Sequence, residues 1–133
     1  MEKINKTFLK DSHFILELKL CSLRLIDNSK FPWIILVPKR HKATDIYQLN
    51  KKDQNLLIKE IVYASKIMKK TFKAFNLNIE KIGNVVSQLH IHIIARYKRD
   101  SSWPLSVWVV KKSAYSKIKL HKTIVKLKKA FKV

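Results

Sequence analysis

The chain of 133 residues contains little cysteine, glycine or arginine, and it has no long apolar run. Its one cysteine, Cys21, excludes a disulfide within the chain, so we expect a reducing, cytoplasmic location and a small buried apolar role for this residue. No stretch approaches the roughly 18 to 20 apolar residues of a membrane-spanning helix, and residues 1–6 lack the apolar segment of a secretory signal. The composition therefore predicts one globular domain without a transmembrane segment.

Acidic residues are also scarce, because 29 lysines and arginines stand against 9 aspartates and glutamates, for a formal net charge of +20. Such a charge favours weak, non-specific and salt-sensitive binding to polyanions. Arginine, which usually makes the bidentate contacts to phosphates and bases, occurs at only four positions. Lysine, isoleucine and asparagine are abundant, which also matches the codon usage of an AT-rich genome. A lysine-rich binder of nucleic acid or anionic surfaces is therefore kept as an alternative function.

The most informative stretch is residues 88–94, in which polar or basic residues alternate with aliphatic ones. This period of two predicts a β-strand over residues 88–96 whose aliphatic side packs on the core. The other side carries Gln88, His90 and His92. Such a row can be a polar surface, part of a metal site, or a site of nucleophilic catalysis by imidazole. Metal is disfavoured because a closed zinc site needs four ligands and the other histidines lie far along the chain.

The rest of the pattern predicts an α+β domain. Residues 1–10 are expected to form a loose terminus. Residues 20–26 and 31–37 are expected to pair as an antiparallel hairpin across a polar turn, after a strand or extended arm at residues 11–19. A long helix should run from an N-cap at Asn50 to about Phe75, because its apolar residues recur every three or four positions: Leu57, Ile61, Ala64, Met68, Phe72 and Phe75.

Two further segments flank or follow the polar strand. Residues 76–81 are expected to form a turn that starts a short strand. Gly83, the only glycine, marks either a simple hairpin turn or a functional turn in which the backbone approaches a ligand. Residues 111–133 have the apolar spacing of a basic amphipathic helix. We expect this helix to pack on its own domain, with a partner subunit or an anionic membrane as alternatives.

Three blocks of the sequence resemble the histidine-triad (HIT) superfamily. Residues 88–94 match its pattern His-φ-His-φ-His-φ-φ, where φ is hydrophobic, with glutamine in the first histidine position. Residues 83–96 and the Trp-Pro-x-x-Val-Trp block at residues 103–108 resemble a bacterial, diadenosine polyphosphate hydrolase-like branch. A Phe-Pro-Trp-φ-φ-Leu-Val-Pro block at residues 31–38 matches as well. The resemblance implies a HIT-like domain over residues 1–110, with its core at about 11–110, followed by the C-terminal helix.

The resemblance also implies a fold and an activity. The fold would be a HIT-like antiparallel β-sheet with one long helix packed on it, assembled as a homodimer. The protein would be a nucleotide hydrolase or transferase that cleaves at the α-phosphate of dinucleoside polyphosphates, such as diadenosine tetraphosphate, or of other adenylylated compounds. The reaction would pass through a nucleotidyl-histidine intermediate and would require no metal or cofactor.

The resemblance assigns roles residue by residue. His90, at the middle histidine, would be the nucleophile, and His92, at the last histidine, would hydrogen-bond the phosphate oxygens. Gln88 stands where the first histidine would orient the others. The nucleotide-binding candidates are Gly83 and Asn84 for the phosphate, Asp27 or Asn28 for the ribose, and Trp33 for the nucleoside.

Two departures from the family pattern concern catalysis. Gln88 cannot exchange a proton as imidazole does. Val85 stands where many HIT enzymes carry a serine or threonine that assists the leaving group. We therefore expect slow turnover or a leaving group that needs little help, and we keep a non-catalytic nucleotide-binding module as an alternative.

Overall fold

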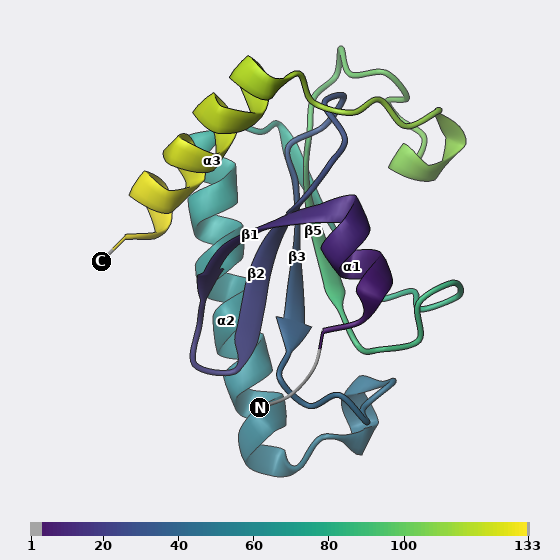
Figure 1. The fold of residues 1–133 in the computed structure, drawn as a ribbon, viewed down its shortest axis with the longest axis vertical. Helices are drawn as coiled ribbons and strands as arrows, with labels where there is room; N and C mark the ends of the chain where they lie inside the picture. The colour runs from purple at the N-terminus through teal and green to yellow at the C-terminus, as the bar shows by residue number, and fades with distance from the viewer. Residues whose placement is uncertain (1–3, 133) are drawn as a thin grey trace.

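A five-stranded antiparallel sheet forms the centre of the molecule, in the strand order β1-β2-β3-β5-β4 (Figure 1). This computed structural model describes residues 4–132. The predicted α+β class and the HIT-like sheet with helices packed on it are confirmed. The edges of the sheet are formed by β1 and β4. The strands are β1 (Ser12–Glu17), β2 (Cys21–Ile26), β3 (Trp33–Pro38), β4 (Asn76–Glu80) and β5 (Ile91–Arg96).

The helices divide between the two faces of the sheet (Figure 1). One face is covered by α2 (Lys51–Thr71) and α3 (Lys117–Phe131), which share a continuous aliphatic core with the sheet. The other face carries α1 (Lys6–Asp11) and the short 3₁₀ helix η2 (Val107–Val109). A second 3₁₀ helix, η1 (Ile46–Gln48), precedes α2. None of the described helices is long and apolar enough to cross a membrane.

The long helix α2 begins as predicted and ends earlier than predicted. The side chain of Asn50 accepts a hydrogen bond from the Asp53 N–H at 2.8 Å, so Asn50 is the N-cap. The helix ends at Thr71, and the backbone of Lys73 then takes a φ of 51° as the chain turns toward β4. Phe75 therefore lies outside the helix and is 54% exposed. The predicted stripe is buried at Leu57, Ala64 and Met68.

The expectation of a loose terminus at residues 1–10 is wrong for the part that is described. Residues 1–3 lie outside the described residues, but α1 begins directly after Asn5, whose side chain accepts the Thr7 N–H at 2.8 Å. Phe8 is buried against Ile35 and Val37 of β3. Two adjacent apolar residues, Phe8 and Leu9, give no periodic signal, so only the tertiary contact of Phe8 shows why this short helix forms.

The polar strand and the C-terminal helix both start later than predicted. The strand β5 begins at Ile91, because the chain before it bonds to a loop: the Leu89 N–H donates to the Ala43 carbonyl at 2.9 Å. The helix α3 begins at Lys117 and not at residue 111. It packs on its own domain, where Leu127 and Phe131 are buried in the core shared with α2. Residues 76–80 form the complete edge strand β4.

Candidate active site

A pocket of about 570 Å³ opens on the face of the sheet that carries α1 and η2. Its floor comes from β3 and β5, and its walls come from α1, the loop at residues 82–86, and the segment around η2. Most of the lining is apolar, and two imidazoles lie within it. The lining includes Phe8, Asn28, Trp33, Gly83, Asn84, Val85, His90, His92 and Trp108.

His90 and His92 lie side by side in this pocket. Their ring centroids are 4.8 Å apart, and the ring planes are inclined by 72°. Both residues are buried, at 7% and 4% exposure. Ile91 and Ile93 point into the aliphatic core on the opposite face of the sheet. The alternation seen in the sequence therefore separates a packing face from a polar face, as predicted.

The ring of His90 is held by a backbone hydrogen bond. Its Nδ1 lies 2.7 Å from the carbonyl oxygen of Gln88. Because a carbonyl oxygen only accepts, this bond assigns a proton to Nδ1 and leaves the lone pair of the neutral ring on Nε2. Burial lowers the pKa of His90, which the bond to Gln88 partly opposes. His90 is therefore neutral at pH 7, with Nε2 free of the backbone bond.

His92 is held by a side chain from the neighbouring strand. The Nε1–H of Trp33 donates to His92 Nδ1 at 2.9 Å. Burial and the adjacent His90 lower the pKa of His92 to about 3. His92 is therefore also neutral at pH 7, and the site holds two uncharged imidazoles beside each other.

Trp108 is a site residue that we did not predict. Its ring packs edge-on against His92 at 5.3 Å and against Trp33 at 5.0 Å between centroids. Its Nε1–H donates to the Glu80 carboxylate at 2.7 Å, which ties η2 to the edge strand β4. The Trp-Pro-x-x-Val-Trp block was the available signal, but the pattern alone does not show which ring faces the histidines.

The structure places Gln88 toward α1 and not among the residues that line the pocket. Its Oε1 accepts the backbone N–H of Asn5 at 2.8 Å, at the start of α1. Phe8 of the same helix packs edge-on against the His90 ring at 4.6 Å. Gln88 thus fastens the helix that covers one side of His90, and its backbone carbonyl contacts the His90 ring. The orienting role of its side chain, implied by the family pattern, stays a prediction.

The predicted phosphate-side residues lie together at the pocket. Gly83 has a φ of 79°, a left-handed conformation that favours glycine, so a turn requires it here. Asn84 follows it and is exposed, and both residues line the pocket. Val85 also lines the pocket and is 94% exposed. Because its side chain is aliphatic, the pocket has no hydroxyl group at this position.

Of the two residues predicted to contact the ribose, only one lies at the pocket. Asn28 is buried and lines the pocket, with its Oδ1 accepting the Lys30 N–H at 3.1 Å. Asp27 is not among the lining residues. Its carboxylate accepts the Tyr115 N–H at 3.0 Å and lies 3.8 Å from His13 Nε2. The structure therefore does not bring Asp27 to the pocket, because its side chain ties the sheet to the segment before α3.

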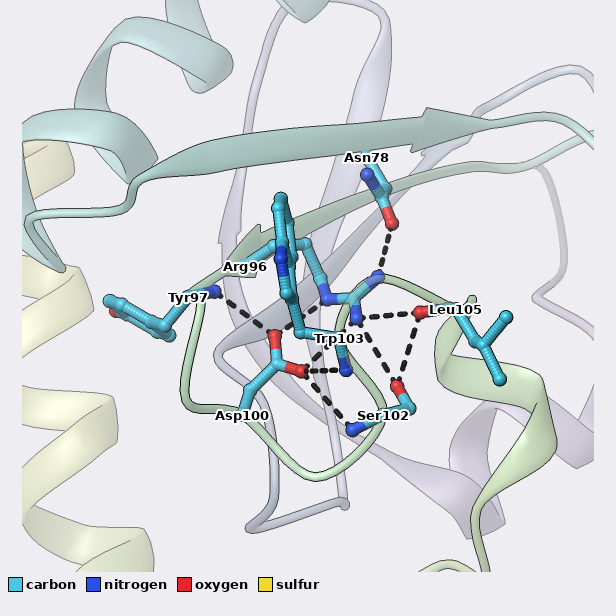
Figure 2. Close-up of polar contacts among 7 residues, drawn as sticks. All are labelled: Asn78, Arg96, Tyr97, Asp100, Ser102, Trp103 and Leu105. Carbon is cyan, nitrogen blue, oxygen red and sulfur yellow. Dashed lines mark hydrogen bonds and ion pairs between the residues drawn. The ribbon is translucent and has the colours of Figure 1, made fainter.

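A buried arginine organises the loop that leads to η2 (Figure 2). Arg96, at the end of β5, is 1% exposed and pairs with Asp100 at 2.8 Å. Its guanidinium also donates to the Leu105 carbonyl and to the side chains of Asn78 and Ser102. Burial raises the pKa of Asp100, but hydrogen bonds from Arg96 and from backbone N–H groups outweigh it and bring that pKa to about 2. We did not predict this cluster.

Within residues 4–132, no three histidine, cysteine, aspartate or glutamate side chains gather closely enough to hold a metal ion. Asp11 and Lys112 line the pocket and face each other at 3.6 Å, and neither was predicted. The pocket therefore offers imidazole, amide and backbone groups and one carboxylate–ammonium pair, on an apolar, aromatic background.

Comparison with known proteins identifies the family of the domain. The chain matches the HIT domain over residues 8–99. It is 34% identical to the histidine triad protein blr8122 of Bradyrhizobium japonicum, with a TM-score of 0.93 and 97% of each chain covered. It is 31% identical to a histidine triad protein of Marinobacter aquaeolei VT8, with a TM-score of 0.94, and the match covers 98% of this chain and 96% of that one.

The protein therefore belongs to the HIT family, whose members commonly bind or hydrolyse nucleotides. A histidine triad protein of Sinorhizobium meliloti 1021 is similar too, at 30% identity and a TM-score of 0.93 over 98% of this chain and 97% of that one. A search of curated proteins gave no match.

Proposed function

We propose that this protein is a HIT-type nucleotide hydrolase or transferase that cleaves at the α-phosphate of dinucleoside polyphosphates or other adenylylated compounds. The observation that carries the proposal is the hydrogen bond between His90 Nδ1 and the Gln88 carbonyl, 2.7 Å long. It leaves Nε2 of a neutral, pocket-lining imidazole as a nucleophile. The apolar and aromatic lining suits a nucleoside, and the loop with Gly83 and Asn84 suits a phosphate.

The reaction proceeds in two displacements. In the first, the lone pair of His90 Nε2 forms a bond to the α-phosphorus, while the bond from phosphorus to the leaving oxygen breaks and its electron pair departs with the leaving group. The Nδ1–H of His90 keeps its hydrogen bond to the Gln88 carbonyl, and this bond stabilises the positive charge that develops on the ring. In the second, water attacks phosphorus, loses a proton to solvent, and the nitrogen–phosphorus bond breaks to restore neutral His90.

The leaving group receives little help from this chain. Val85 has no proton to donate, and the Oε1 of Gln88 is occupied by the Asn5 N–H. General acid–base assistance is typically worth about 10² to 10⁴ in rate, so its loss matters. A phosphoanhydride, whose leaving group departs as a stable anion, suits this site better than an amine or alcohol ester. A non-catalytic nucleotide-binding module is the second candidate, because the same two positions favour it.

Assembly as a homodimer is part of the proposal. The edge strand β4 pairs on one side only within the sheet order, and Ile79 on it is 49% exposed. Phe75, directly before the strand, is 54% exposed. An open edge with exposed apolar residues suits pairing with a second copy.

The test is turnover of diadenosine tetraphosphate, an AMP phosphoramidate and an AMP ester, with released AMP measured by chromatography. Wild type should cleave the anhydride fastest, and His90→Ala should lose turnover by at least about a hundredfold while it still folds. His121→Ala, which changes an exposed histidine on α3, is the matched control and should keep full activity. Undiminished activity in His90→Ala would contradict the mechanism. AMP binding without turnover of any compound would favour the binding module.

A further inference from the structure

The contact between Trp33 and His92 determines where the proton of His92 lies. An indole Nε1–H can only donate, and here it donates to His92 Nδ1 at 2.9 Å. A neutral imidazole has one protonated and one unprotonated nitrogen, so an Nδ1 that accepts leaves the proton on Nε2. Both side chains are buried, at 4% exposure each, so water does not compete freely for this bond.

The sheet register holds the two rings in this relation. Trp33 of β3 stands opposite Ile94 of β5, and His92 lies two residues before Ile94 on the same face. The indole therefore reaches His92 diagonally across the strand pair. Trp33 packs in a buried cluster with Phe31, Ile94 and Val107, and its ring meets that of His92 edge-on at 5.6 Å. The position of the indole N–H relative to His92 is therefore set by the backbone register and by packing.

The neighbouring histidine carries the opposite arrangement. His90 Nδ1 faces a carbonyl, which only accepts, whereas His92 Nδ1 faces an indole N–H, which only donates. The two adjacent imidazoles are therefore set in opposite tautomers by two different partners. Within the pocket, one ring offers a lone pair and the other offers an N–H.

We propose that Trp33 is a positioning residue that fixes His92 as the Nε2–H tautomer, so that a hydrogen-bond donor for a phosphate oxygen stands beside the nucleophile His90. This role adds to the expected apolar contact of Trp33 with the nucleoside. The tautomer assignment depends only on the geometry of this chain. The use of the donor on a phosphate rests on the proposed function.

The direct test is nitrogen NMR of the full-length protein labelled with ¹⁵N-histidine, at pH 7. The His92 signals are assigned by their loss in His92→Asn. In wild type, Nδ1 should be unprotonated and Nε2 protonated. In Trp33→Phe, which keeps an aromatic ring but removes the donor, both tautomers should be populated. Trp108→Phe removes another indole that packs on His92 but bonds elsewhere, so it should keep the wild-type tautomer.

A binding measurement tests the use of the donor. The ratio of AMP affinity to adenosine affinity isolates the phosphate contact, because a lost indole contact to the nucleoside weakens both ligands equally. We expect this ratio to fall about fivefold in Trp33→Phe and to stay unchanged in Trp108→Phe. An unchanged ratio in Trp33→Phe, despite mixed tautomers, would overturn the link to the phosphate.

Two results would overturn the tautomer assignment itself. One is an NMR spectrum of wild type in which His92 is protonated on Nδ1; this measurement does not depend on the folding of any variant. The other is a folded Trp33→Phe protein in which His92 remains entirely in the Nε2–H form. If wild type binds neither AMP nor adenosine, the proposed function fails, and the NMR result still decides the role of Trp33.

Discussion

The two faces of the sheet are built from the same strands but held together in different ways. The face under α2 and α3 is a single continuous cluster of aliphatic side chains. The opposite face has two small clusters, one around Trp33 and one around Phe8, with the imidazole pocket lined by members of both. On that face, hydrogen bonds and a buried ion pair fix the side chains that packing alone does not.

This difference explains how one strand serves both stability and chemistry. Ile91 and Ile93 of β5 are almost fully buried in the aliphatic cluster. His92 and Arg96 project to the other face. There His92 accepts a hydrogen bond from Trp33, and Arg96 forms an ion pair with Asp100. Packing on one face can therefore keep the strand in place while the other face leaves a ring nitrogen unbonded for reaction. Substitutions on the polar face should therefore change it while the aliphatic face stays intact.

The largest effect is expected from Arg96→Met. The change leaves the Asp100 carboxylate, 3% exposed, without its cation. Breaking a buried pair by removing one partner typically costs about 3 to 5 kcal/mol, so the free energy of unfolding measured in urea should fall by that amount. Arg99→Met changes an exposed arginine on the same loop and should stay within about 0.5 kcal/mol of wild type. Equal losses in the two variants would mean that the ion pair does not hold this face.

The contrast between the faces also explains what the sequence could predict. The aliphatic face repeats with the periods of strands and helices, so α2, the β2–β3 hairpin and the alternation at residues 88–94 were all predictable. The polar face depends on single contacts between distant residues. Asn5 with Gln88 and Glu80 with Trp108 are examples, and neither pair has a periodic signature.

Some predicted ends of helices and strands were wrong because they also depend on individual contacts. The start of β5 is set by a tertiary hydrogen bond, from the Leu89 N–H to the Ala43 carbonyl. The start of α3 is set by the N-cap Ser116, and α2 ends where Lys73 takes a positive φ, and neither position is marked by the apolar periodicity. The family resemblance identified His90 and His92 and the loop at Gly83. It did not show that Asp27 bonds to Tyr115 outside the pocket, because the choice between Asp27 and Asn28 depends on which way one turn residue points.

A smaller effect concerns acid stability. Burial lowers the pKa of His92 from 6.5 to about 3. The unfolded chain then binds a proton before the folded chain does, so stability is complete above about pH 6.5 and is lost as the pH falls toward 3. The slope is at most about 1.4 kcal/mol per pH unit for this group. Unfolding free energies at pH 7 and pH 5 should differ less in His92→Asn than in wild type.

The exposed His121 on α3 supplies the control for this pH dependence. His121→Asn should show the wild-type difference between pH 7 and pH 5, because this substitution lies on the exposed side of α3 and leaves His92 and its partners unchanged. Burial lowers the pKa of His90 as well, so part of the slope should remain in His92→Asn. If His92→Asn and wild type lost the same stability, the acid sensitivity would have another source.

The smallest effect is expected from Gln88→Ala, which removes the acceptor of the Asn5 N–H. A hydrogen bond of this kind contributes about 1 kcal/mol, and the loss should be local to α1. Amide hydrogen exchange at Phe8, whose N–H donates to the Asn5 carbonyl at 3.0 Å, should become roughly fivefold faster. Ser87→Ala changes an exposed neighbour and should leave this exchange rate unchanged. Unchanged exchange in Gln88→Ala would show that the bond from the Asn5 N–H to Gln88 does not hold α1.

The proposed mechanism requires a covalent bond between His90 and the α-phosphorus. The most direct measurement is rapid quenching of wild-type protein during turnover of diadenosine tetraphosphate, followed by digestion and mass spectrometry of the peptide that contains residue 90. We expect an AMP group on His90 that is lost on mild acid treatment and is absent from His90→Ala. Turnover at the wild-type rate with no covalent nucleotide, or with nucleotide on a different residue, would contradict it.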